Sequence, residues 1–234
     1  MNSLFVQKYT MLFKREAKVH SSAELRRNEI LEAALLVVAD GGPDAITFRR
    51  VADRARVPLG SLTYYFDSRE DLLREAFRHY LAEATAFIAE LEGGKRRSSS
   101  AAIVELVLEV ARREFSDDAA MVRVEYELIV YAARDSALAR EFNAYERWIE
   151  TRLAASLEAM GAPRPIDASR TIIDVVRGFE LERLTHTDAQ LDDLERRLKL
   201  VIDALINERP AGAARQRHQA HRLRESNPRR RSIP

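Results

Sequence analysis

Residues 46–66 constrain the fold of this chain more than any other segment. Thr47 is placed to begin a short helix, because its hydroxyl can accept a hydrogen bond from a backbone N–H of the first turn. Pro58 disfavours the helical conformation at the residue before it, yet it is well tolerated in the first turn of a new helix. The segment therefore predicts two short helices joined by a tight turn. Apolar side chains recur at helical spacing in both, at Val51, Ala52 and Ala55 in the first and at Leu62 and Phe66 in the second.

The polar side chains of this segment suit a surface that reads DNA. When Leu62 and Phe66 pack inward, the second helix presents small and hydrogen-bonding groups outward, and the first helix adds positive charge. A short helix of this kind beside a cluster of arginines is what a reader of the major groove requires. The outward groups are Gly60, Ser61, Thr63 and Tyr64, and the arginines are Arg49, Arg50 and Arg54.

Residues 21–73 resemble the DNA-binding domain of the TetR family of bacterial transcriptional regulators. The pattern is a capped first helix, Thr-x-Arg-x-Val-Ala in the second, Val-x-x-Gly-x-Leu-x-Tyr-x-Phe around the recognition helix, and Lys/Arg-Glu-x-Leu opening the fourth. The matching residues are Thr47, Arg49, Val51, Ala52, Val57, Gly60, Leu62, Tyr64, Phe66, Arg69, Glu70 and Leu72. The resemblance implies an all-α protein. An N-terminal three-helix helix-turn-helix domain would be joined by a long helix to a C-terminal helical domain that binds an effector and dimerises.

The resemblance also implies which residues contact DNA. In relatives, the residues at the positions of Thr47, Tyr64 and Arg69 contact phosphates. The arginine at the position of Arg49 reaches a guanine edge, where a bidentate contact is worth about 1–3 kcal/mol of discrimination. The full set expected at the DNA is Thr47, Arg49, Arg50, Leu59, Gly60, Ser61, Thr63, Tyr64, Tyr65 and Arg69.

Two positions of the recognition helix depart from the family pattern. The family usually has Tyr where this chain has Thr63, and His where it has Tyr65. The expected function is a repressor that leaves a palindromic operator when a small, mostly apolar effector binds. Two alternatives stay open at this point. One is a helix-turn-helix regulator that activates or needs no ligand, and the other is a helical binding module that no longer reads DNA.

The rest of the sequence predicts six further helices, and the whole chain is expected to divide into four regions. Helices are expected over 68–92, 101–115, 119–134, 137–160, 167–184 and 188–206, which gives nine in all with no strand. Thr187 and Gln190 form a candidate capping box for the last of them. We expect a flexible arm at 1–20, a helix-turn-helix domain at 21–80, an effector-binding and dimerisation domain at 81–208, and a disordered basic tail at 209–234. Met11 is a second candidate for the first residue.

Two sites are expected in the C-terminal half. A tyrosine or tryptophan suits an effector cavity, because each combines a flat apolar body with one hydrogen-bonding tip. The candidate lining residues are Phe115, Tyr126, Ile129, Phe142, Tyr145, Trp148 and Phe179, with core packing as the simpler interpretation for each. The last two helices carry wide apolar stripes, which together with the resemblance favour a homodimer interface. Its candidates are Ile172, Val176, Leu191, Leu194, Leu198, Val201, Ile202 and Leu205.

Composition narrows the functional classes. The net charge of +1 is unevenly distributed along the chain. Residues 209–234 form a tail with eight arginines and one glutamate, which leaves a net charge of −6 on the remaining residues. Any DNA contact must then come from a localised surface or from the tail, through phosphate contacts. No membrane span is expected, and the absence of cysteine fits a cytoplasmic protein. The five histidines stand in no metal-binding spacing and no nucleophile motif is found, so we expect neither an enzyme, a cofactor nor a metal.

Overall fold

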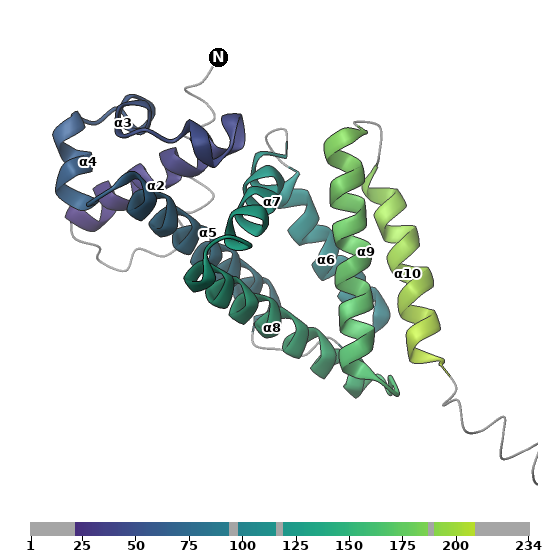
Figure 1. Cartoon of the computed structure of the whole chain (residues 1–234). Helices are drawn as coiled ribbons and strands as arrows, with labels where there is room; N and C mark the ends of the chain where they lie inside the picture. Colours follow the sequence, from purple (N-terminus) through teal and green to yellow (C-terminus); the bar gives the residue numbers. More distant parts are fainter. Residues whose placement is uncertain (1–21, 94–97, 116–118, 187–189, 209–234) are drawn as a thin grey trace, which may run out of the picture.

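The computed structural model describes residues 22–93, 98–115, 119–186 and 190–208. The expected N-terminal arm and basic tail, at 1–20 and 209–234, lie outside these ranges. Within them the chain forms nine α-helices and one 3₁₀ turn and contains no strand (Figure 1). The all-α fold predicted from the sequence is confirmed.

The N-terminal helices begin and end where the local sequence predicts. Thr47 caps its helix by accepting a hydrogen bond from the backbone N–H of Arg50 at 3.1 Å. Ser68 caps the long fourth helix by accepting from the N–H of Asp71 at 3.0 Å. The elements are α2 (Ser22–Gly41), η1 (Pro43–Ala45), α3 (Phe48–Ala55), α4 (Leu59–Tyr65) and α5 (Arg69–Glu92).

The C-terminal helices also follow the prediction, except at the start of the last one. They are α6 (Ser100–Glu114), α7 (Ala120–Ala132), α8 (Ser136–Ala159), α9 (Pro165–Thr185) and α10 (Leu191–Ile206). The capping box of α10 is formed by Gln190 and Asp193, not by Thr187 and Gln190 as expected. An acidic side chain at 193 can reach back to the N–H of residue 190, so the helix begins at 191 rather than at 188. Thr187 itself lies outside the described residues.

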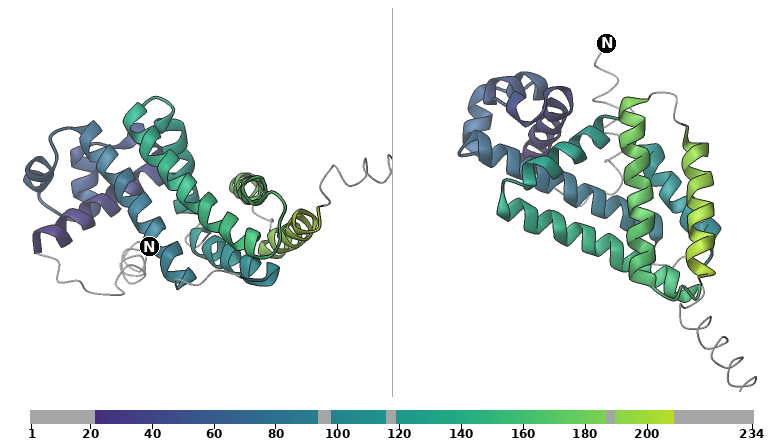
Figure 2. Two further views of the ribbon diagram at one scale, coloured as in Figure 1. Left: turned by 90° about the horizontal axis from the view of Figure 1, so that it is seen from below. Right: turned by 45° about the vertical axis from the view of Figure 1, so that its right-hand side comes forward.

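Two clusters of buried side chains organise the molecule. The first joins α2, α3, α4 and α5 with α7 and the first half of α8. The second joins α6, α9 and α10 with the end of α8. Figures 1 and 2 show α5 and α8 side by side along the molecule, with α9 and α10 standing together at the far end. The domain boundary near residue 80 stays a prediction, and the first core extends well beyond it along the chain.

Candidate DNA-reading surface and ligand cavity

The first surface is formed by α3 and α4. Arg49 and Arg50 are exposed on α3, and within the described ranges neither side chain has a hydrogen bond or ion pair. Arg54 differs, because its Nη1 lies 2.7 Å from a carboxylate oxygen of Asp40. Arg49 and Arg50 are therefore the cations of α3 that remain available to an external partner.

The recognition helix α4 separates its packing and outward faces as expected. Leu62 is fully buried, and Phe66, directly after the helix, is 2% exposed. Tyr64 is 79% exposed and Leu59 52% exposed, so both large side chains face solvent. The remaining outward positions are Gly60 and Thr63, which are exposed, and Ser61 and Tyr65, which are half-buried.

Arg69 is engaged within the chain. Its Nε donates to the carbonyl of Ile46 at 2.9 Å, and its Nη2 donates to the carbonyl of Pro43 at 2.8 Å. These bonds fasten the start of α5 to the segment between α2 and α3. The expectation that the Arg69 side chain reaches a phosphate stays a prediction. Its two hydrogen bonds also hold the segment before Thr47 and α3 in place.

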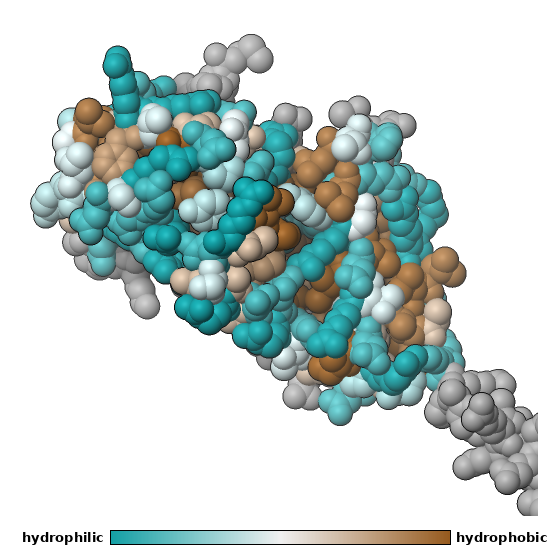
Figure 3. Space-filling view, viewed as in Figure 1, coloured by the Kyte–Doolittle hydropathy of each residue, from teal (hydrophilic) through white to brown (hydrophobic). Residues whose placement is uncertain are grey.

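The second candidate site is a cavity of about 310 Å³ between α5, α6, α8 and α9. Figure 3 shows apolar side chains reaching the surface between α8 and α9. The apolar face of α6 lines the cavity, at Ile103, Leu106, Val107 and Val110. Such a cavity, with apolar walls and a few polar groups, is typical of a small-molecule site.

Of the seven expected effector residues, only Tyr145 lines this cavity. The other six have different surroundings, because most of the aromatic side chains pack against each other or against a neighbouring helix. Phe115 and Phe179 pack edge to face at 5.6 Å between ring centroids, and Phe142 and Ile129 belong to the first core. Tyr126 donates to the carbonyl of Arg177 at 3.0 Å, and Trp148 lies against the guanidinium of Arg152. Core packing accounts for Phe115, Ile129, Phe142 and Phe179, whereas Tyr126 and Trp148 are partly exposed and belong to neither core.

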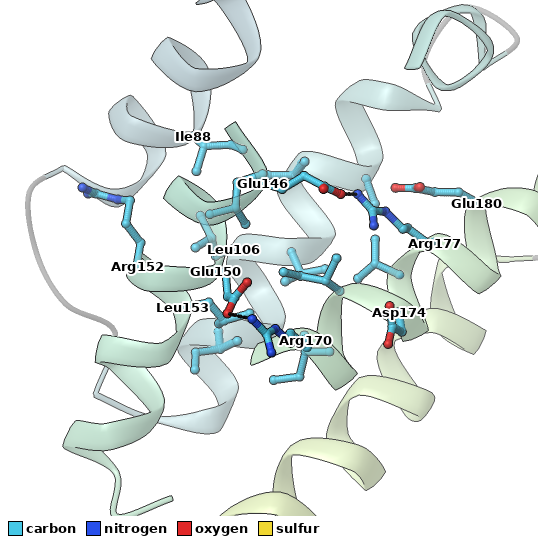
Figure 4. Close-up of a pocket in the computed structure, with 18 of the residues that line it drawn as sticks. Ile88, Leu106, Glu146, Glu150, Arg152, Leu153, Arg170, Asp174, Arg177 and Glu180 are labelled. Atoms are coloured by element: carbon cyan, nitrogen blue, oxygen red, sulfur yellow. Dashed lines mark hydrogen bonds and ion pairs between the residues drawn. The ribbon is translucent and has the colours of Figure 1, made fainter. Parts of the chain in front are cut away.

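Charged side chains line much of the cavity. Three arginines are each paired with a glutamate of the lining: Arg152 with Glu92, Arg170 with Glu150 at 3.0 Å, and Arg177 with Glu146. Figure 4 shows the pairs of Arg170 and Arg177, with Glu180 beside Arg177. Glu114, Glu125, Asp174 and Glu180 also line the cavity, and none of them forms an ion pair with an arginine of this lining.

Glu114, Glu125 and Glu180 lie together at one end of the cavity, where Glu180 is buried and the other two are half-buried. Burial, together with the charge of the neighbouring Glu125, raises the pKa of Glu180 to about 7. Burial also raises the pKa of Glu125 and raises that of Glu114 well above its ordinary value. Hydroxyl groups hold two of them, since Tyr80 donates to Glu125 at 2.8 Å and Tyr126 to Glu180 at 3.1 Å. The carboxyl groups at this end of the cavity therefore keep their protons at pH values where a solvent-exposed glutamate has already lost its proton.

The expected dimer residues divide into two groups. Ile172, Leu194, Leu198 and Ile202 are at most 1% exposed and belong to the second core, so they face the chain's own helices and not a second copy. This corrects the expectation for these four residues. The regular apolar stripe of α10 is buried against α6 and α9 of the same chain. The other four, Val176, Leu191, Val201 and Leu205, are partly exposed.

The eight interface candidates do not include the residues that the outer faces of α9 and α10 expose. Leu181 is 50% exposed and Leu200 is 74% exposed, and Gly178 and Ala204 also face solvent. For α10, the helical period could have identified them in the sequence. Leu200 and Ala204 lie on the side of the helical wheel opposite Leu194, Leu198 and Ile202. Figure 3 shows apolar surface over α10.

Comparison with known proteins identifies the family. The family model described as "Bacterial regulatory proteins, tetR family" matches residues 30–76, and the model "Tetracyclin repressor-like, C-terminal domain" matches residues 98–208. The transcriptional repressor KstR of Mycolicibacterium smegmatis is 30% identical over 198 residues, which cover 82% of this chain and 92% of that one. The chain belongs to the TetR family.

Two further relatives extend this comparison. KstR of Mycobacterium tuberculosis is 28% identical over 87% of this chain and 90% of its own. The crystal structure of the multidrug binding protein EbrR complexed with proflavin is 28% identical, with a TM-score of 0.51 over 75% of this chain and 99% of that chain. This TetR-family chain is a DNA-binding transcriptional regulator. No helix in the described ranges is both long and apolar enough to span a membrane.

Proposed function

We propose that this TetR-family chain is a homodimeric repressor that leaves its operator when a small molecule enters the cavity of the C-terminal half. One observation carries the proposal: α5 belongs to both sites. Its first half packs under the helix-turn-helix through Leu72, Leu73 and Phe77, whereas Ile88 and Glu92 of its second half line the cavity. A ligand that shifts α5 therefore also shifts the helices that face DNA.

Polar contacts give this coupling a physical path. Glu125 lines the cavity and accepts a hydrogen bond from Tyr80 of α5. Two residues before Tyr80 on α5, Arg78 donates to Glu141 of α8 at 2.9 Å and pairs with Glu75, which in turn pairs with Arg27 of α2. On α7, Arg123 donates to the carbonyl of Ala39 near the end of α2 at 3.1 Å. A ligand that weakens operator binding about 100-fold needs about 2.7 kcal/mol of differential affinity between the two states.

At the DNA, two copies of α4 would enter successive major grooves of a roughly palindromic operator, about 34–36 Å apart. Arg49 would read a guanine, and Arg50 and Tyr64 would contact phosphates. Thr47, Leu59, Gly60, Ser61, Thr63 and Tyr65 would complete the surface, and Arg69 would support it from behind. The protein would act in the cytoplasm, where its operator is.

The homodimer would form through α9 and α10. We assign its centre to the exposed Gly178, Leu181, Leu200 and Ala204, flanked by the partly exposed Val176, Leu191, Val201 and Leu205. Gly178 has open space around the position of a Cβ, so a second helix can approach the backbone closely there.

The experiment is binding of the purified protein to DNA that flanks its own gene, followed by fluorescence anisotropy at two salt concentrations. Binding that exceeds that of a scrambled duplex at both salt concentrations supports the proposal. Arg49→Ala is expected to lose about tenfold or more of the specific affinity, because a bidentate base contact is worth about 1–3 kcal/mol. Arg147→Ala is the matched control, since it removes an exposed arginine of α8 far along the chain.

Two results would contradict the proposal. If Arg49→Ala leaves both the affinity and its salt dependence unchanged, α3 and α4 do not read DNA. If specific binding is found but no small molecule that enters the cavity weakens it, the chain regulates without a releasing ligand.

A further inference from the structure

The cavity has a polar end whose charges are unbalanced. Each of its three arginines already has a carboxylate partner, so no arginine is left to receive an anionic ligand. Glu114, Glu125 and Glu180 have no such partner, and Glu125 raises the pKa of both Glu114 and Glu180, so the three carboxyl groups lie close together. When all three are ionised, this end carries an excess of negative charge that only a cation can offset.

A second observation points to a missing partner at the same end. Tyr145 lines the cavity and is only 9% exposed, yet within the described parts of the chain its hydroxyl makes no hydrogen bond. Burial and the charges of Glu125, Glu114 and Glu180 raise its pKa, which places the hydroxyl near all three carboxyl groups. A buried hydroxyl without a partner is costly, and a bound donor group would satisfy it.

The cation is organic rather than a metal ion. Among the residues that the structure describes, no three acidic or histidine side chains are arranged to hold a metal. The opposite end of the cavity is apolar, with walls that include Leu106, Val107 and Leu153. An occupant must therefore combine an apolar body with a positively charged donor.

We propose that the cavity takes an amphipathic organic amine, whose ammonium group donates its three N–H groups to Glu125, Glu180 and the Tyr145 hydroxyl, beside Glu114, while its apolar body lies along α6 and α8. The inference rests on the proposed function, since it names the class of ligand that would release the operator. It also replaces the expectation of a mostly apolar effector. In the empty protein these carboxyl groups hold protons, and the arriving ammonium group stabilises their ionised forms and displaces a proton to solvent.

The test compares three eight-carbon probes that differ only in the head group: octylammonium, octan-1-ol and octanoate. Binding of each to the full chain is measured by isothermal titration calorimetry at pH 7.5 without DNA. Octylammonium is expected to bind about tenfold or more tightly than octanoate, because an ammonium group makes charge-assisted hydrogen bonds with carboxylates and a second carboxylate is repelled by them. Equal or tighter binding of octanoate would overturn the inference, and so would the failure of octylammonium to bind.

Substitutions assign the preference to the named residues. Glu180→Gln and Glu125→Gln keep the side-chain shape and each is expected to reduce the preference for octylammonium at least about threefold. Tyr145→Phe is expected to weaken octylammonium and leave octan-1-ol unchanged. Glu182→Gln is the matched control, because it lies on α9 outside the cavity lining and pairs with Arg197. Thermal unfolding verifies that each variant is folded. If both glutamine variants keep the full preference, the assignment is wrong.

A separate arm distinguishes this inference from the proposed function. Octylammonium is added to the complex of the protein with its operator, and anisotropy reports release. Tight octylammonium binding without release would contradict the proposed repression mechanism and leave the ligand class intact. Release by all three probes at equal occupancy would support the mechanism and overturn the ligand class.

Discussion

The two halves of this molecule use buried volume differently. Under the helix-turn-helix, α2 and the first half of α5 bury an almost wholly apolar core, including Ile30, Leu72 and Phe77. In the C-terminal half, glutamates and arginines, most of them partly exposed, line a cavity between helices. The first arrangement favours one rigid geometry for the DNA-facing helices, whereas the second costs stability that a complementary ligand can restore. The comparison indicates which half is built to be constant and which is built to respond.

The largest effect is expected from removing a fully buried ring of the first core. Phe77→Ala should lower the free energy of unfolding by about 3–5 kcal/mol, because it leaves a cavity beneath α2. Phe179→Ala is the matched control, since this ring is equally buried but belongs to the second core. Urea unfolding followed by circular dichroism measures both losses. Operator binding at a temperature where both variants keep their helix content should fall only for Phe77→Ala, and an equal fall in both would erase the distinction.

The second effect is the pH dependence of the free energy of unfolding that Glu180 gives to the C-terminal half. Glu180 has a pKa of about 7 in the folded protein, above its ordinary value of 4.5, so the folded state binds more protons than the unfolded state between these values. The free energy of unfolding therefore falls as the pH rises from 5 to 8, by an amount on the order of 2–3 kcal/mol from this group. Glu114 and Glu125 share this titration, whereas the surrounding Tyr80, Tyr126, Tyr145 and Arg177 do not change protonation in this pH range.

Urea unfolding of wild type and Glu180→Gln across this pH range measures that contribution. The difference between the two proteins should change in the stated direction, because carboxylates elsewhere, such as Asp135 beside Arg74, titrate alike in both. A difference that stays constant from pH 5 to 8 would show that Glu180 is ionised throughout, as an exposed carboxylate is.

The same contrast explains what the sequence could predict. Caps at Thr47 and Ser68 and the buried Leu62 and Phe66 depend on local spacing, which a sequence displays directly. The cavity brings Glu114, Glu125 and Glu180 together from three helices, and their common environment depends on packing that no local pattern encodes. Aromatic composition was therefore a poor guide to the lining, and only Tyr145 was found by it.

The interface prediction included four core residues for a related reason. A periodic apolar stripe indicates that a helix is buried, but it does not say whether its own chain or a second copy covers it. The stripe of Leu194, Leu198 and Ile202 is covered by α6 and α9. Only the exposure of Leu200 and Leu181 in the folded chain indicates which face remains for a partner.

The smallest effect tests two arginines within the DNA-binding half. Arg69 donates to two backbone carbonyls, whereas Arg49 has no partner among the described residues. Arg69→Ala should lower the free energy of unfolding by about 1–2 kcal/mol, because charged donors to the carbonyls of Ile46 and Pro43 are lost at a partly exposed site. Arg49→Ala should leave stability within about 0.5 kcal/mol of wild type, as surface substitutions do, and act on operator binding alone.

Urea unfolding and operator anisotropy on the two variants, with Arg69→Lys added, complete this test. A lysine keeps the positive charge at position 69 but cannot donate to two carbonyls in the fixed geometry of a guanidinium. If Arg69 acts by holding the segment before α3, Arg69→Lys should lose stability nearly as Arg69→Ala does. If Arg69→Lys instead restores full stability and full operator affinity, a positive charge near phosphate is all that this position supplies, and Arg69 belongs with Arg49 as a direct contact.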